Sequence, residues 1–428
     1  MKKEITIFWF RRDLRLIDNI GLIAALNSNY SVLPIFIFDE DIIDELPKDD
    51  ARISFIYENL KQIDTNLKTF GSSLIVKKGK IDEVWKELCS EFEIKSVFAN
   101  EDYEPYAIQR DLIIENYLAS KNIPFHLLKD QVIFAKGEVL KQDQTPYTVY
   151  TPFKNKWREQ FATLNLVVDE ELSNPNFTQL KNDFPALEEI GFVKSKIKVK
   201  PYKIENIANY SEIRNYPALD GTSYLSPHLR FGTISIRSLA LKFRSNTVLL
   251  DELIWREFFM QILFHFPKVV DGNFREKYDF IQWRNNQEEF EKWKNGQTGY
   301  PIVDAGMRQL NTTGYMHNRV RMITAGFLCK HLLIDWRWGE AYFAEKLLDY
   351  DLSANNGNWQ WSAGTGCDAA PYFRVFNPTE QVKKFDPELK YIRKWVPEID
   401  DLTYPLPMVE HKFARERALK VYKEGIEK

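Results

Sequence analysis

The segment around residues 251–266 carries a carboxylate and an indole at a spacing that could line a binding pocket. Glu252 and Trp255 are three residues apart, so they share one face of a helix. A carboxylate beside an aromatic ring could bind a flat ligand. An ion pair between Glu252 and Arg256, one helical turn further on, would instead explain the acid without any ligand. The spacing leaves both interpretations open.

A second segment, residues 347–378, combines acids, amides, indoles and glycines. Its most polar part contains Asp349, Asp351, Asn355, Asn356, Trp359 and Trp361. Two adjacent asparagines are an unusual choice for a simple apolar core, so we expect a loop that lines a ligand. A junction between helices, with asparagines as capping residues, is the alternative.

Residues 221–227, GTSYLSP, place small hydroxyl side chains before an expected helix. Ser226 is a candidate N-cap and Pro227 a candidate first helical residue. The free N–H groups of such a helix start attract a phosphate or pyrophosphate. A capped helix without any ligand would have the same sequence, so this segment needs support from its context.

Residues 308–338 hold an excess of basic side chains over the single acid Asp335. The basic residues are Arg308, Arg319, Arg321, Lys330 and Arg337. Gly314 is expected to end one helix, and the next helix would place Asn318, Arg321 and Met322 on one face. The segment predicts a local patch for phosphates, although a solvated helix face is the alternative.

The elements that must position these residues fall into two classes along the chain. From residue 5 to about residue 128, the strand-like runs ITIFWF, SVLPIFIF, SLIVKK and KSVFAN alternate with helical segments, which predicts a parallel, Rossmann-like α/β sheet. The loop after the first run carries Arg11, Arg12, Asp13 and Arg15 in place of GxGxxG, so an ordinary dinucleotide site is not expected. After residue 200, helical patterns dominate. We predict an α/β domain over 1–130, a partly ordered connector over 131–200 that ends in the lysine-rich KSKIKVK, and a larger all-α domain over 201–428.

Composition limits the function further. The formal net charge of the 428 residues is -3, which excludes a uniformly basic nucleic-acid coat protein, so any nucleic-acid site must be local. Cys89, Cys329 and Cys367 lack CxxC spacing, so we expect no metal site and no disulfide framework, and a reducing cytoplasm fits. No run approaches the length of a membrane helix. Aromatic residues make up 14%, which is compatible with flat ligands or stacked bases.

Long motifs in a fixed order carry a resemblance to a known family. They run from FWFRRDLRLIDN at the start through ELIWREF, TGYPIVDAGMRQL, GYMHNRVRMI, IDWRWGE, NNGNWQW and GTGCDAAPYFRVFNP to HKFARERALKVYK near the end. Together they resemble the photolyase and cryptochrome flavoproteins over nearly the whole chain, with the greatest likeness to microbial class I photolyases. The resemblance implies an α/β domain joined to a helical domain that binds FAD. It also implies a deoxyribodipyrimidine photo-lyase: photoexcited reduced FAD donates an electron to a flipped-out cyclobutane pyrimidine dimer in DNA. A monomer without membrane attachment is expected.

The resemblance also assigns residues to the flavin. Those expected to contact FAD are Tyr210, Thr222, Ser223, Tyr224, Leu225, Ser226, Arg321, Asp349, Tyr350, Asp351 and Asn355. Asp349 and Asp351 resemble the acids beside the isoalloxazine, and Arg321 resembles the partner of Asp349. Asn355 resembles the amide that faces flavin N5. Plant cryptochromes carry an acid there, so Asn355 favours repair.

Further residues are assigned to the lesion, the DNA backbone and electron transfer. The expected lesion and DNA contacts are Arg214, Glu252, Trp255, Asn318, Arg319, Met322 and Trp361. Trp283, Trp336 and Trp359 resemble the tryptophans that pass an electron to oxidised flavin, with Trp338 as a nearby competitor. We expect Glu252 and Asn355 to act in catalysis with those three indoles. A helix would place Asn355 and Trp359 on one side.

The likeness weakens at the second, light-harvesting chromophore. Tyr106 and Ala107 stand where folate-binding members have an Asn-Glu pair, and Val270 stands where they place a lysine. A deazaflavin, FMN, a folate held differently or an empty cleft all remain open. Leu249 replaces a tryptophan that contacts flavin in some relatives.

Two other functions are alternatives to dimer repair. A cryptochrome-like blue-light receptor would use the same FAD and tryptophans, but no long extension follows HKFARERAL, which disfavours signalling. Repair of the (6-4) photoproduct needs a histidine-rich pocket, whereas this segment offers His317, Asn318 and Met322.

Overall fold

The computed structural model describes residues 3–204 and 209–427, which form two compact units. Unit 1 comprises Met1–Val139, Trp157–Pro201 and Leu225–Leu250. Unit 2 comprises Leu140–Lys156, Tyr202–Tyr224 and Asp251–Lys428. Each unit is therefore assembled from three separate stretches of chain. The predicted division at residues 130 and 200 stays a prediction.

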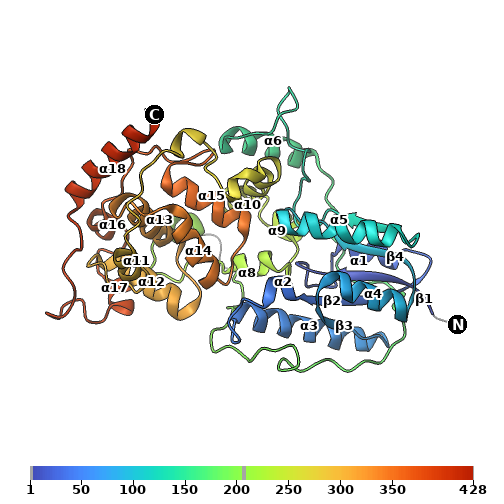
Figure 1. The fold of residues 1–428 in the computed structure, drawn as a ribbon. Helices are drawn as coiled ribbons and strands as arrows, with labels where there is room; N and C mark the ends of the chain where they lie inside the picture. The colour runs from blue at the N-terminus through green and yellow to red at the C-terminus, as the bar shows by residue number, and fades with distance from the viewer. Residues whose placement is uncertain (1–2, 205–208, 428) are drawn as a thin grey trace. The chain divides into compact units, whose positions relative to one another are not determined.

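Unit 1 is built on a five-stranded parallel sheet (Figure 1). The strands are β1 (Glu4–Phe10), β2 (Ser31–Asp39), β3 (Ile75–Gly79), β4 (Glu93–Asn100) and β5 (Phe125–Leu128), in the spatial order β3-β2-β1-β4-β5. The predicted parallel sheet is confirmed, and β5 is a short additional strand. Side chains of the central strand β1 are buried on both faces, as in other parallel sheets covered by helices.

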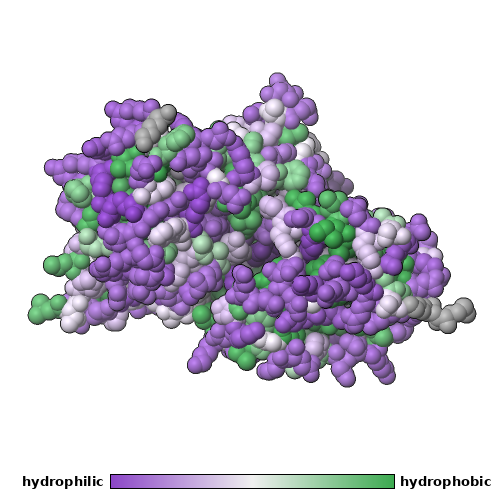
Figure 2. Space-filling view, viewed as in Figure 1, coloured by the Kyte–Doolittle hydropathy of each residue, from purple (hydrophilic) through white to green (hydrophobic). Residues whose placement is uncertain are grey.

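Helices cover both faces of this sheet. The helices are α1 (Ile20–Leu26), α2 (Glu40–Ile43), α3 (Ala51–Thr69), α4 (Ile81–Glu91) and α5 (Pro105–Ala119). Unit 1 also contains α9 (Ile236–Lys242). Phe8 and Phe10 of β1 join a core with α1 and α3, whereas Ile7 and Trp9 join a second core with α4 and α5. The outer side of α5 exposes Ile108, Leu112 and Ile113, and Figure 2 shows hydrophobic surface there.

Buried ion pairs connect α9 to the loops that follow β1 and β5. Arg237 of α9 donates to the carboxylates of Asp18 and Asp130, at 3.0 Å and 2.9 Å. Arg15 adds a further bond to Asp130 at 2.7 Å. Burial raises the pKa of Asp130, but the two guanidinium groups outweigh it and hold the pKa below its usual value. The arginines after β1 therefore serve packing within unit 1.

Residues 131–200 are largely attached to other elements. They include α6 (Tyr150–Thr163), a helix of 14 residues. Further on, Val32 of β2 donates its N–H to Asn176, and Thr178 returns a bond to Val32, both at 2.8 Å. Phe177 between them is buried in the core beside α1 and α3. The second half of this segment therefore runs along the sheet.

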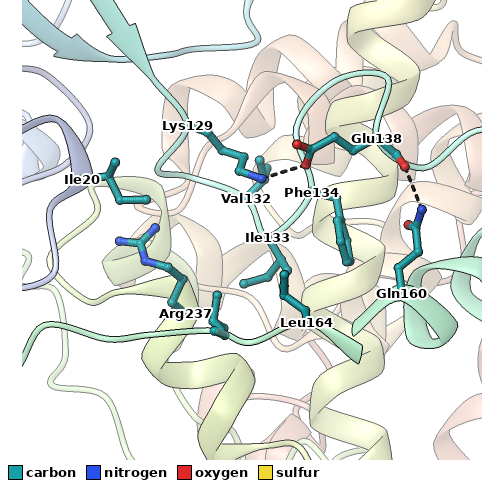
Figure 3. A pocket seen from close by; sticks show the side chains of 10 residues that line it. Ile20, Lys129, Val132, Ile133, Phe134, Glu138, Gln160, Leu164 and Arg237 are labelled. Carbon is teal, nitrogen blue, oxygen red and sulfur yellow. Dashed lines mark hydrogen bonds and ion pairs between the residues drawn. The ribbon is translucent and has the colours of Figure 1, made fainter. Parts of the chain in front are cut away.

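Unit 1 also contains a cavity of about 400 Å³ (Figure 3). At its rim, Lys129 forms an ion pair with Glu138 at 2.7 Å, and Gln160 donates to the backbone oxygen of Glu138 at 3.0 Å. The cavity is lined by Ile20, Lys129, Val132, Ile133, Phe134, Glu138, Gln160, Leu164, Leu166 and Arg237. It is mostly apolar, and its charged side chains are paired with each other or with buried acids.

Beyond Leu128 the described residues contain helices and no named strand, which confirms the helical second part. The elements are α7 (Tyr210–Ile213), α8 (Leu225–Arg230), α10 (Thr247–His265), η1 (Pro267–Val270), η2 (Glu276–Tyr278), α11 (Gln287–Lys294), α12 (Pro301–Thr313), α13 (Asn318–Gly326), η3 (Phe327–His331), α14 (Trp336–Lys346), α15 (Leu352–Ala363), α16 (Pro378–Phe385), α17 (Lys390–Trp395) and α18 (His411–Ile426). Gly314 ends α12 with a left-handed φ of 68°, as predicted. None of the helices in the described ranges is long and apolar enough to cross a membrane.

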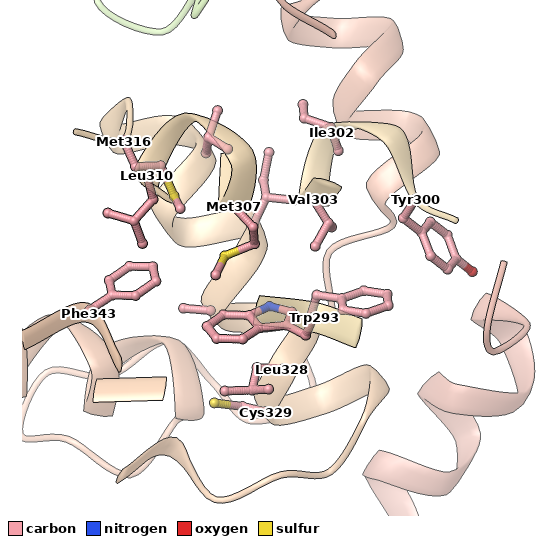
Figure 4. Packing of buried hydrophobic residues seen from close by; sticks show 14 of the residues in the cluster. Trp293, Tyr300, Ile302, Val303, Met307, Leu310, Met316, Leu328, Cys329 and Phe343 are labelled. Atoms are coloured by element: carbon pink, nitrogen blue, oxygen red, sulfur yellow. The ribbon is translucent and has the colours of Figure 1, made fainter. Parts of the chain in front are cut away.

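The core of unit 2 is centred on Trp293, which is fully buried (Figure 4). Its ring stacks against Phe343 at 6.1 Å, and Met307, Leu310 and Leu328 belong to the same cluster. The indole N–H donates to the backbone oxygen of Thr324. This core joins helices α11 to α15, among them α13 with Arg321 and α15 with Asn355.

Candidate functional site

The first part of the site is an ion pair between α13 and the loop before α15. Arg321 donates from Nη2 to both carboxylate oxygens of Asp349, at 2.9 Å and 3.2 Å. Its Nε donates to the backbone oxygen of Met316 at 2.9 Å. The Asp349 side chain is only 6% exposed, whereas the Arg321 side chain is 27% exposed. The guanidinium is therefore fixed in place and still open to a ligand on one side.

The segment that begins at Asp351 is a helix, so the expected ligand-lining loop is wrong. Asp351 is the N-cap of α15, and its side chain accepts from the N–H of Ala354. The helix then carries Asn355, Trp359 and Trp361. Asn355 and Trp359 are one turn apart and share a side, as the helical alternative required.

The amide of Asn355 has a fixed orientation. Its Nδ2 donates to Glu340 of α14 twice, to the backbone oxygen at 3.0 Å and to Oε1 at 2.9 Å. Among the described residues nothing donates to the remaining Oδ1. Burial raises the pKa of Glu340, and the bond from Asn355 opposes that rise. The site therefore presents an oriented acceptor to a ligand that carries a hydrogen.

Sequence reasoning did not identify Glu340. It lies in the quoted motif IDWRWGE but four residues after Trp336, a spacing that suggested no partner for Asn355. Only the packing of α14 on α15 brings the carboxyl and the amide together.

Two of the three predicted electron-transfer indoles lie in one core. Trp336 and Trp359 are both buried there, and the Trp336 N–H donates to Oδ1 of Asn273 at 2.9 Å. Trp359 packs on Gly339, three residues after Trp336 on α14. The Trp359 ring also meets Phe343 edge-on at 4.9 Å. Trp359 of α15 therefore packs on α14 one turn from the position of Trp336.

Trp283 is half-buried and packs against this same core. Its ring meets Tyr422 of α18 edge-on at 5.8 Å. Trp338, the competitor, packs edge-on against Phe290 at 5.2 Å. Tyr350, a predicted flavin contact, is half-buried against the same core.

Several predicted lesion and DNA contacts form one connected group in unit 2. Arg214 forms an ion pair with Glu252 at 2.5 Å. The neighbouring Asn215 accepts from Nη2 of Arg319 at 2.7 Å, and Nη1 of Arg319 lies 3.8 Å from the sulfur of Met322. Residues from α10 and α13 are thus connected through the chain segment after α7. Asn215 was not predicted.

Burial and neighbouring arginines shift the pKa values of two residues in this group, Glu252 and His317. Burial raises the pKa of Glu252, and the adjacent Arg214 opposes that rise. His317, which caps α13 by accepting from the N–H of Arg319, has its pKa lowered to about 4 by burial and by nearby arginines. Asn318 follows it and is exposed. The imidazole is therefore neutral at pH 7.

Trp255 of α10 stacks on Tyr150, which sequence reasoning also missed. The ring centroids are 3.5 Å apart and the planes differ by 9°. Tyr150 is held by its hydroxyl, which donates to the backbone oxygen of Asp251 at 2.9 Å, and by its N–H, which donates to Asp368 at 3.0 Å. One indole face is thus supported by a fixed ring. Trp361, another expected lesion contact, is half-buried on α15.

Helices α10 and α15 touch at a glycine. A Cβ at Gly357 of α15 would lie 2.1 Å from the ring of Phe259 on α10. The Phe259 ring is in turn 5.5 Å from that of Trp255. The helix with Asn355 therefore packs directly on the helix with Glu252 and Trp255.

The expected phosphate segment differs in detail from the prediction. Helix α8 begins at Leu225, so Ser226 lies inside it and is not the N-cap, and Pro227 is its third residue. Tyr224, directly before the helix, has a positive φ of 53°. Thr222, Ser223 and Tyr224 belong to unit 2, whereas Leu225 and Ser226 belong to unit 1. A phosphate site formed by all five stays a prediction.

Tyr210, the other predicted contact of this group, is half-buried on α7. The guanidinium of Arg214 lies 5.4 Å from its ring centroid. Burial and the nearby carboxylate of Glu252 raise the pKa of the Tyr210 hydroxyl to about 12. The hydroxyl is therefore protonated at neutral pH.

The predicted basic patch over residues 308–338 is wrong as a single surface. Lys330 is buried and donates to the backbone oxygen of Ala363 at 2.6 Å. The arginines at 308, 321 and 337 pair with separate acids, Glu398, Asp349 and Asp335. Arg319 alone of the five bonds to a neutral side chain.

Comparison with known proteins agrees with this arrangement. Residues 6–176 match the family model for DNA photolyase, and residues 249–403 match the model for the FAD binding domain of DNA photolyase. A deoxyribodipyrimidine photo-lyase of a Synechococcus species is 35% identical over 98% of this chain and 96% of its own length. The chain belongs to the photolyase and cryptochrome family.

Solved structures of photolyases have the same fold over their full lengths. A class III photolyase from Agrobacterium tumefaciens is 32% identical, with a TM-score of 0.88 over 100% of this chain and 99% of its own. An archaeal photolyase from Sulfolobus tokodaii, solved with two FAD molecules, is 36% identical, with a TM-score of 0.83 over 98% of this chain and 100% of its own.

The residues of this photolyase family member fit a flavin. The FAD-binding match covers α10 to α17 and so includes Arg321, Asp349, Asp351 and Asn355. Asn355 is buried, yet its Oδ1 receives no bond from the described residues, as expected of an amide that faces a ligand.

Of the residues that differ from the folate-binding members, Tyr106 is hydrogen-bonded within unit 1. The hydroxyl of Tyr106 donates to Asp39 at the end of β2, at 2.6 Å. Burial and this carboxylate raise the pKa of Tyr106. Ala107 is buried, and so is Leu249 on α10, while Val270 ends η1.

Proposed function

We propose that this protein repairs cyclobutane pyrimidine dimers in DNA in a light-dependent reaction, as a deoxyribodipyrimidine photo-lyase. Bound FAD in its reduced form would supply the photoexcited electron that splits the dimer. The observation that carries the proposal is the orientation of Asn355. An amide whose N–H groups are both used by Glu340 offers an acceptor, which suits a flavin carrying a hydrogen at N5.

The protein's own residues would hold the flavin and the lesion in fixed positions. Arg321 and Asp349 would position the flavin ring, with Asp351 and the 222–226 segment as further contacts. Trp255 would stack against the extruded bases, because damaged bases are cheap to unstack and Tyr150 already supports the other face of the indole. Trp361, Asn318 and Met322 would complete the pocket.

Glu252 would hydrogen-bond the dimer through the oxygen that faces away from Arg214. Charge develops on the dimer during splitting, and a donor fixed in advance stabilises such charge without reorganisation. Burial raises the pKa of Glu252, and the ion pair with Arg214 opposes that rise. Arg214 and Arg319 would contact the DNA backbone.

The test compares two lesions in light and in darkness. Chemically reduced protein is incubated with DNA carrying thymine dimers or (6-4) photoproducts, and the remaining lesions are counted. Light-dependent loss of thymine dimers alone is expected. Equal counts in light and dark would leave a photoreceptor as the better candidate, and loss of the (6-4) lesion would change the substrate.

We further propose that Trp359, Trp336 and Trp283 conduct an electron inward when the flavin is oxidised. Trp359→Phe should abolish light-driven reduction of bound FAD by an added thiol, followed as bleaching of the flavin absorbance, while repair after chemical reduction persists. Normal bleaching would assign the electron to another path. Lost repair after chemical reduction would place Trp359 in the repair step itself or in holding the flavin.

On the resemblance alone, we propose that the protein is a monomer that acts in the cytoplasm, and that a second chromophore serves as an antenna. No disulfide joins the three cysteines, all of which lie within the described residues, and this is compatible with a reducing compartment. Release of the bound chromophores by denaturation, followed by their absorbance spectra, distinguishes a deazaflavin, FMN or a folate from FAD alone.

A further inference from the structure

The lysine-rich segment of unit 1 is a feature that the proposed repair site does not use. The side chains of Lys194, Lys196, Lys198 and Lys200 are exposed, while Ser195 between them is buried and Ile197 and Val199 are half-buried. No acidic residue occurs between positions 190 and 204. The segment therefore presents alternate ammonium groups on one side. We call these four lysines the lysine strip.

The backbone of the lysine strip is held at several points. Ser195 donates its N–H to the hydroxyl of Ser54 on α3 at 2.9 Å. The backbone oxygen of Lys200 lies 2.9 Å from Nε2 of His228. Just before the strip, Phe192 is buried and Val193 bonds to Lys48. The lysine side chains thus extend from a backbone that hydrogen bonds hold in place, which fixes the spacing of their Cα atoms.

Nearby acids compensate little of the charge of Lys194, Lys196 and Lys198. Lys194 pairs with Glu58 at 2.8 Å, but both side chains are more than half exposed, and such pairs are weak. Lys196 and Lys198 form no ion pair with any of the residues that the structure describes. Lys48 adds another exposed ammonium group beside Phe192. A protein with a net charge of -3 therefore carries a concentrated cationic surface here.

We propose that the lysine strip binds the phosphate backbone of duplex DNA, as a contact region separate from the lesion pocket. Alternate residues of an extended chain are at most about 7 Å apart, close to the rise of two nucleotides along one strand at about 3.4 Å each. Membrane lipid fits less well, because the apolar residues between the lysines face inward and leave no anchor. This inference rests on the proposed function for its choice of polyanion.

The experiment uses the full-length protein and undamaged duplex DNA. The test variant combines Lys194→Gln, Lys196→Gln and Lys198→Gln. We expect its plot of log affinity against log salt concentration to be less steep than that of the wild type, by about 2 to 3 units of slope. The ratio of wild-type to variant affinity should then grow by about 40-fold between 200 mM and 50 mM salt. The matched control combines Lys61→Gln, Lys121→Gln and Lys181→Gln, three exposed lysines of unit 1 with the same total charge. The control should keep most of the wild-type slope.

The outcomes distinguish failure of the lysine strip as a DNA contact from failure of the proposed repair function. Equal slopes for the strip variant and the control would overturn the strip, whatever the repair assay gives. If the strip variant lost affinity for heparin or for anionic vesicles but not for duplex DNA, the lysines would bind another polyanion, and the proposal would be overturned. A protein that repairs nothing in light but shows the slope difference would refute the proposed function and retain the strip. Unchanged thermal unfolding confirms that all variants are folded.

Discussion

A single added methyl group at Gly339 should disturb the path between the indoles. Its Cβ would lie 2.1 Å from Cη2 and 2.5 Å from Cζ3 of Trp359, and 2.6 Å from a methyl carbon of Leu328. Restoring an ordinary contact of 3.4 Å to Cη2 requires a shift of about 1.3 Å. Overpacking of this kind costs about 1–3 kcal/mol, while Gly→Ala inside a helix gains at most about 1 kcal/mol. We expect Gly339→Ala to lose about 1–2 kcal/mol of stability.

Two measurements on this variant test the reasoning. Thermal unfolding should show a midpoint lower by roughly 2–8 °C, and light-driven reduction of bound FAD by a thiol should slow, because Trp359 moves relative to Trp336 and Asn355. The matched control is Gly326→Ala, also in a helix, where the nearest atom to a Cβ is on Phe376 at 3.7 Å. That variant should be as stable as the wild type or more so. If Gly339→Ala matched the control in both assays, the packing of Trp359 on α14 would be refuted.

Two further predictions concern buried acids with opposite dependence on pH. Asp130→Asn should cost about 3–5 kcal/mol near pH 7, because Arg15 and Arg237 lose their buried partner. The folded pKa of Asp130 is lowered, so its contribution is present above the unfolded value of about 3.9 and is lost as pH falls through the folded value; urea unfolding should show the difference shrinking in acid. Glu340→Gln should raise the unfolding midpoint at pH 7, because burial raises the folded pKa of Glu340 and a glutamine oxygen still accepts from Asn355. Here the stability of the wild type rises as pH falls, because Glu340 becomes protonated. The stability advantage of the variant should therefore vanish below about pH 4. An advantage that grew in acid would contradict the raised pKa of Glu340.

The sheet could be predicted from sequence because its signals are local. Runs such as ITIFWF are apolar at every position except Thr6, which is typical of strands buried on both faces. The strand Phe125–Leu128 was missed because four residues, with a histidine among them, give no periodic signal. The order of the strands depends on crossovers that no single segment encodes.

The misread helix α15 shows where local reasoning ends. Asparagine is a poor helix former, so NNGN indicated a loop. In the structure, Asn356 and Gln360 both donate to the backbone oxygen of Val269, at 2.9 Å and 3.1 Å. Those tertiary bonds compensate the weak propensity, and their acceptor lies more than eighty residues away in sequence. The basic patch failed for the same reason, because Glu398 and Asp349 are distant in sequence from the arginines that they pair with.

The three-part construction of unit 1 also sets a schedule for its folding during synthesis. Asp18 and Asp130 are made early, but Arg237, which pairs with both, follows Asp130 only after another 107 residues. At about 5–20 residues per second, that interval lasts about 5–20 s. During it, burying the carboxylate of Asp18 would be costly without that guanidinium, whereas Asp130 already has Arg15 as a partner. In a nascent chain that ends at Val139, the loop with Asp18 should therefore remain unpacked. It should pack only when α9, which carries Arg237, has left the ribosome.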